Sequence, residues 1–141
     1  MSFDPGNNIV QLCAKGMQLE GEGKPAEASQ VFQQAWDEAS NDLEKFIAAH
    51  YVARHKQTVE DKLDWDTRAL NHALQVTDET MKAQYPSLYL NIAKCYEDLN
   101  DVENALIHYQ MALFFVKSLP ADGYGAMIKS GILKGMERVK L

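Results

Sequence analysis

Apolar residues recur at helical spacing along most of the chain, and the stretch from Pro86 to Ala112 shows this most clearly. Its first half places Tyr89, Ile92, Ala93 and Tyr96 at i, i+3, i+4 and i+7, which is the spacing of one helix face. Its second half repeats the face with Ala105, Tyr109 and Ala112. The polar pair Asn100-Asp101 between them supplies a turn and an N-cap oxygen. The stretch therefore predicts two helices that pack as an antiparallel hairpin.

The same pattern occurs 77 residues earlier in the chain, at the distance from Gly16 to Ala93. Six positions match in one register: Gly16, Leu19, Gly23, Ala28, Phe32 and Ala35 pair with Ala93, Tyr96, Asn100, Ala105, Tyr109 and Ala112. The pattern resembles the tetratricopeptide repeat (TPR), a helical hairpin of about 34 residues with an A-x3-F-x2-A block in its second helix. Leu12 and Tyr89 stand at its tryptophan site and preserve bulk, whereas Lys15 stands at its leucine site.

The resemblance implies an all-α fold, a right-handed stack of antiparallel helical hairpins, or α-solenoid, in one domain over residues 1–141. We expect repeat units over about 8–40, 42–77 and 86–119 and a capping helix over about 123–140. The middle repeat is irregular, because Ala73 lies 38 residues after Ala35 and 39 before Ala112. A helix this short cannot bury its own apolar face, so neighbouring hairpins must cover one another.

Local signals place the helix ends. Helices are expected from an Asn8 cap to about Glu20, from Pro25 to Ala39, from Leu43 to Gln57 and from Val59 to Val76, the last with a cap at Thr58. Residues 77–85 form a polar connection or extend the fourth helix. The sixth helix is expected to continue through Phe115 to Leu119, where Pro120 ends it, and Asp122 caps a final helix to about Val139.

Composition excludes several classes of function. The formal charge of −6 argues against nucleic acid as a partner and against a polybasic membrane patch. The apolar runs are too short for a membrane-spanning helix, and the first ten residues do not form a signal peptide. Cys13 and Cys95 fall in helices of different repeats, so we interpret both as free thiols. These features predict a cytoplasmic protein.

The chain lacks the common signatures of catalysis. It has no glycine-rich phosphate-binding loop and no serine-, cysteine- or histidine-centred nucleophile motif. His50 and His55 are five residues apart and point about 140° apart on a helix, unlike the i, i+4 pair of a zinc site. The sequence therefore predicts a non-enzymatic protein with no catalytic residue, no cofactor and no metal.

The TPR resemblance implies that the first helix of each repeat lines a concave groove for a partner. The groove residues in this register are Cys13, Met17, Tyr51, His55, Leu90 and Lys94, with Asn91 at the edge; His50 and Arg54 replace Tyr51 and His55 if the middle helix is shifted by one residue. We expect Arg54, His55 and Lys94 to converge there, and the partner to be a protein or peptide with apolar and acidic residues. In the structural alternative, Glu97, Asp98 or Asp64 neutralises these charges internally.

Two other functions remain open from sequence alone. One is a small-ligand or enzymatic site around His50, Tyr51, Arg54 and His55, in which tyrosine and histidine act as acid–base groups. The other is a self-associating structural protein, so a homo-oligomer is not excluded.

Overall fold

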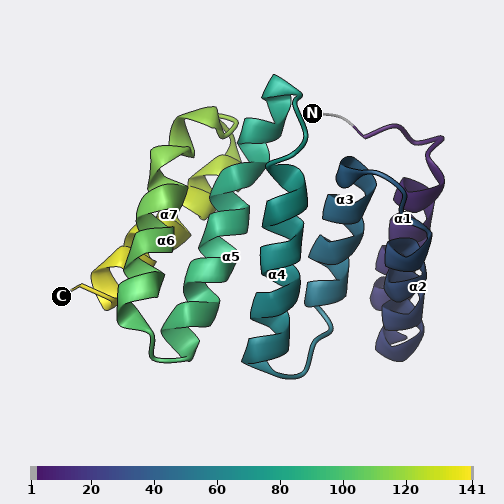
Figure 1. Cartoon of the computed structure of the whole chain (residues 1–141), viewed down its shortest axis with the longest axis horizontal. Helices are drawn as coiled ribbons and strands as arrows, with labels where there is room; N and C mark the ends of the chain where they lie inside the picture. Colours follow the sequence, from purple (N-terminus) through teal and green to yellow (C-terminus); the bar gives the residue numbers. More distant parts are fainter. Residues whose placement is uncertain (1–2, 141) are drawn as a thin grey trace. The chain divides into compact units, whose positions relative to one another are not determined.

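The computed structural model describes residues 3–140, which form seven α-helices, two short 3-10 helices and no β-strand (Figure 1). The prediction of an all-α chain is confirmed for these residues. The chain divides into two compact units, with unit 1 ending at Val76 and unit 2 beginning at Thr77. Each unit is built from helices that neighbour in sequence and pack pairwise.

Unit 1 contains two helical hairpins. The first pairs α1 (Asn8–Gly21) with α2 (Pro25–Glu38), and the second pairs α3 (Asp42–Ala53) with α4 (Val59–Ala73). Helix α3 packs against both α1 and α2, which joins the hairpins (Figure 1). Side-chain caps fix the helix starts: the Asn41 oxygen accepts from the Glu44 amide at 2.9 Å, and the Thr58 hydroxyl accepts from the Asp61 amide at 3.1 Å.

Small residues in unit 1 let its helices approach closely. Ala28, Ala35, Ala48, Ala49, Ala69 and Ala73 are all completely buried. Phe32 is also completely buried, and a β-carbon added to Gly16 would lie only 2.2 Å from its ring. The matched large and small residues of the sequence pattern therefore form the α1–α2 contact.

Unit 2 contains one hairpin and one covering helix. After the 3-10 helix η1 (Glu79–Gln84), α5 (Tyr85–Asp98) pairs with α6 (Val102–Phe114). Asn100 has a left-handed backbone (φ 63°), and the Asp101 carboxylate caps α6 by accepting from the Asn104 amide at 3.2 Å. The turn and cap expected from Asn100-Asp101 are thus confirmed.

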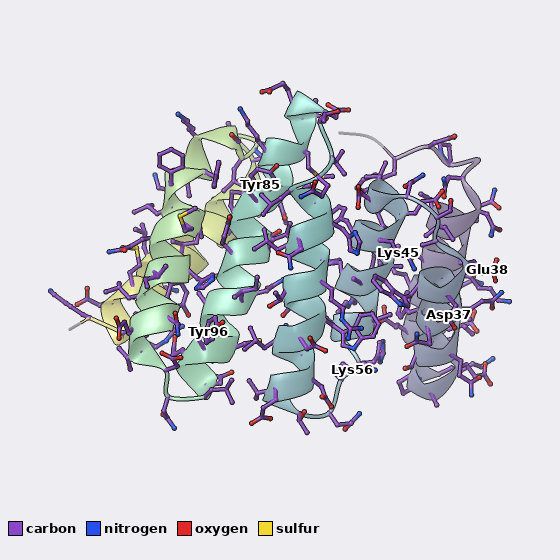
Figure 2. The ribbon with its side chains drawn as sticks, viewed as in Figure 1. Asp37, Glu38, Lys45, Lys56, Tyr85 and Tyr96 are labelled. Carbon is purple, nitrogen blue, oxygen red and sulfur yellow. The ribbon has the colours of Figure 1, made fainter. Side chains whose placement is uncertain are left out.

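Helix α7 (Gly123–Arg138) packs against α5 and α6 and covers the hairpin. The resulting core comprises Ala93, Ala105, Tyr109 and Val139, with Leu90, Tyr96, Leu106 and Met136 packed around it. Tyr96 lies near the turn between α5 and α6, and its ring centroid is 5.0 Å from that of His108 (Figure 2). Asp122 caps α7 through the Gly125 amide (2.9 Å), as expected from sequence.

Three predicted helix ends were wrong. The cap of α1 is Asn7, whose side-chain oxygen accepts from the amides of Ile9 and Val10, and not Asn8. Helix α3 ends at Ala53 and not at Gln57, because the chain must turn to reach the Thr58 cap.

The sixth helix, α6, is the third case, since it ends at Phe114 and is followed by the 3-10 helix η2 (Val116–Ser118). Phe115 turns into an aromatic cluster, with its ring stacked on Tyr89 (6.0 Å) and edge-on to Tyr85 (5.0 Å). Tertiary packing of Phe115 therefore ends the helix five residues before Leu119.

Candidate functional site

The C-terminal ends of α1 and α3 meet around one carboxylate in unit 1. Arg54 Nη2 lies 3.1 Å from Glu20 Oε1, and His55 Nε2 lies 2.7 Å from Glu20 Oε2. Arg54 is the C-cap of α3, and His55 follows it in the turn to α4. We call Glu20, Arg54 and His55 the carboxylate clamp. The two basic residues are those that the sequence marked, and Glu20 is one it did not.

Aromatic packing holds the clamp in place. Phe32 stacks on Tyr51 with ring centroids 5.0 Å apart and an interplanar angle of 15°, and its ring also lies 5.5 Å from that of His55. The Arg54 guanidinium lies 5.4 Å from the Tyr51 ring centroid, within cation–π range. Because Phe32 is completely buried against Gly16, the core of the first hairpin orients the basic residues.

The clamp is open to solvent on the arginine side. The Arg54 side chain is 46% exposed, whereas those of Glu20 and His55 are 20% and 17% exposed. Met17 lies one turn before Glu20 on α1 and is 42% exposed. An exposed apolar side chain and an exposed guanidinium are therefore neighbouring features of the α1 and α3 ends.

The other predicted groove residues of unit 1 are less accessible. Cys13 is 2% exposed, so it is a core residue and cannot contact a partner at the surface. Burial raises the pKa of its thiol to about 12, which keeps it protonated and unreactive at neutral pH. Burial also raises the pKa of the partly buried Tyr51.

His50 is partly buried and points its ring edge-on to Tyr51, with centroids 5.2 Å apart. Burial lowers the pKa of His50, and the nearby Asp66 carboxylate opposes this while Arg54 and Lys62 reinforce it. Asp66 is itself 3% exposed and accepts from Lys62 Nζ at 2.5 Å. His50 thus belongs to a buried polar group on the α4 side of α3, apart from the clamp.

The predicted groove residues of unit 2 have other partners. Leu90 packs into the core under α7, where a β-carbon on Gly131 would lie 3.3 Å from its Cδ2. Asn91 is partly exposed. Lys94 is ion-paired with Asp98 one turn later, as in the structural alternative considered above. Since Lys94 lies in a different unit from Arg54 and His55, convergence of the three cations stays a prediction.

A second cluster of cations and aromatic rings lies on α2, α3 and α4. Trp36 and Trp65 pack edge to face with centroids 4.9 Å apart. Lys45 extends from α3 toward α2 (Figure 2), where its Nζ donates to the Trp36 carbonyl at 2.9 Å and lies 4.1 Å from the Trp36 ring centroid. Arg68 lies 4.3 Å from the Trp65 ring and pairs with Asp64. These contacts join the two hairpins of unit 1.

Glu20 had a sequence signal that was not used. It precedes Arg54 by 34 residues, the length of one tetratricopeptide repeat, so the two positions are equivalent in successive repeats. Stacked repeats bring equivalent positions of their first helices together. A search for opposite charges at that separation would have found the pair.

Comparison with known proteins gives no match, whether to a family model, to a curated protein or to a solved structure. The resemblance to the tetratricopeptide repeat therefore rests on this chain's own residues. Within residues 3–140, every helix is too short or too polar to cross a membrane.

Proposed function

We propose that this chain is a non-enzymatic protein-interaction scaffold that binds a peptide or helical segment on the face formed by α1 and α3. The carboxylate clamp is the observation that carries this proposal. Two basic side chains of one helix already hold a carboxylate there, with geometry suited to an aspartate or glutamate of a partner. The role of first helices as the binding face in tetratricopeptide repeats supports the same assignment.

The clamp has unused capacity to bind an acidic group. Arginine has five N–H donors, and Glu20 lies against only one edge of the guanidinium, at Nη2. With 46% of its side chain exposed, Arg54 has further donors facing solvent. A partner carboxylate either adds to these donors or replaces Glu20, and Met17 offers an apolar contact beside it.

A non-enzymatic role fits the chemistry of the nearby groups. Burial keeps the Cys13 thiol and the Tyr51 hydroxyl protonated, so neither provides a nucleophile or a base at neutral pH. His50, the remaining acid–base candidate, lies in the polar group with Asp66.

The proposal is tested by selecting peptides from a displayed random library on the immobilised protein. Enriched sequences should contain aspartate or glutamate beside apolar residues, and Arg54→Gln should weaken their binding by roughly fivefold, as expected for a partly exposed ion pair. Arg68→Gln removes an equally exposed arginine from α4 and should leave binding unchanged. Salt should weaken binding to the wild type more than to Arg54→Gln. Enriched peptides without acidic residues, or binding that ignores Arg54, would contradict the proposal.

A further inference from the structure

Helix α6 carries a stripe of exposed apolar side chains. Ile107, Met111 and Phe114 are 47%, 38% and 65% exposed and stand at i, i+4 and i+7, on one face of the helix. The opposite face, with Ala105, Tyr109 and Ala112, is completely buried. Single exposed apolar residues are common on proteins, but a continuous stripe of this kind marks an interaction surface.

Opposite charges stand at the two ends of the stripe. Glu103 lies one turn before Ile107, and Lys117 lies in η2, shortly after Phe114. Lys117 Nζ is 5.7 Å from the Phe114 ring centroid, which places it on the same face. Both charged residues are exposed, and neither forms an ion pair with any residue between 3 and 140.

This arrangement is complementary to itself when it is reversed. Glu103, Ile107, Phe114 and Lys117 are placed symmetrically about Gln110 and Met111 along the helix. Two copies of α6 that pack antiparallel across a two-fold axis bring Ile107 against the second copy's Phe114. The same axis brings Glu103 opposite the second copy's Lys117, twice per pair. A parallel arrangement instead sets glutamate against glutamate and lysine against lysine.

We infer that the α6 stripe binds a second copy of this chain and forms an antiparallel, two-fold symmetric dimer. Such an interface uses one patch on both copies, and so the patch must complement itself in shape and charge. The apolar centre supplies the favourable burial of surface. The terminal charges favour the antiparallel over the parallel orientation. This inference concerns unit 2 and is independent of the carboxylate clamp.

Charge reversal gives a test that distinguishes this dimer from any other association. Sedimentation equilibrium should show that the wild-type chain dimerises, and that Glu103→Lys and Lys117→Glu each weaken the dimer roughly tenfold. In each variant, both terminal pairs become repulsive. An equimolar mixture of the two variants should recover association, because every terminal pair in the mixed dimer is again attractive. Lys134→Glu, an exposed reversal on α7, is the matched control and should dimerise like the wild type.

Met111→Glu tests the apolar centre, because it places two like charges beside the axis and should weaken the dimer by more than about a hundredfold. Circular dichroism confirms that each variant is folded; if Met111→Glu is not, the two charge reversals still decide. A wild-type chain that stays monomeric up to about 1 mM overturns the inference. A dimer that the reversals do not weaken, or whose mixed variants fail to recover, overturns it equally.

Discussion

Two glycines of α7, four residues apart, should respond to alanine with opposite signs. A β-carbon on Gly135 would lie 2.2 Å from Tyr109 Cε1 and 2.3 Å from Cζ, far inside van der Waals contact. The ring has no space to retreat, because Tyr109 is completely buried and its hydroxyl donates to Glu97 at 2.7 Å. At Gly131 the nearest atom is the flexible end of Leu90, at 3.3 Å.

The magnitudes follow from two competing effects. Alanine is favoured over glycine inside a helix by about 1 kcal/mol. Overpacking a filled core costs about 1–3 kcal/mol, and disturbing the Tyr109–Glu97 hydrogen bond adds about 1 kcal/mol. We therefore expect Gly135→Ala to lower the free energy of unfolding by about 1–3 kcal/mol. Gly131→Ala should leave it unchanged or raise it by up to about 1 kcal/mol.

Urea denaturation followed by far-UV circular dichroism measures both changes. In a Tyr109→Leu background the clash is absent, so Gly135→Ala should cost less there than in the wild type. A Gly135→Ala variant as stable as the wild type, or equal shifts for the two glycines, would refute the packing described for α7.

Three further changes test the packing and the charges. Ala105→Leu overfills the completely buried α5–α6 contact and should lower the free energy of unfolding by about 1–3 kcal/mol; an unchanged urea midpoint would refute the assigned register. The Arg138 hydrogen bond lowers the pKa of Glu97, so its stabilisation is present above about pH 4.5 and is lost as the pH falls; Glu97→Gln should reduce the loss of stability between about pH 7 and 3. Burial lowers the pKa of His50, so protonation should destabilise the fold as the pH falls below 6.5, and His50→Gln should weaken this dependence in melting temperatures at about pH 7.5 and 5.5.

Local sequence signals predicted the helices and their hairpin pairing well. Asn100, Asp101 and Thr58 act within a few residues, so periodicity and capping rules identify their roles. The end of α6 could not be predicted in this way, because Phe115 is directed by Tyr85 and Tyr89, about 26 to 30 residues away in the chain.

The candidate site was predicted only in part for the same reason. Arg54 and His55 stand out within one polar helix end, but their partner Glu20 comes from another hairpin. Cys13 has the spacing of a groove residue, yet the packing of α1 buries it in the core. Helical spacing gives the face on which a residue lies, and it does not show what covers that face.

The most direct test of the carboxylate clamp compares the affinity of one selected acidic peptide for four proteins by isothermal titration. If a partner carboxylate competes with Glu20 for Arg54, Glu20→Gln should bind the peptide about fivefold more tightly than the wild type, and Arg54→Gln about fivefold more weakly. Glu22→Gln makes the same charge change two residues away, where Glu22 pairs with Lys24, and should bind like the wild type. Equal affinities for all four proteins, or weaker binding by Glu20→Gln, would contradict the account.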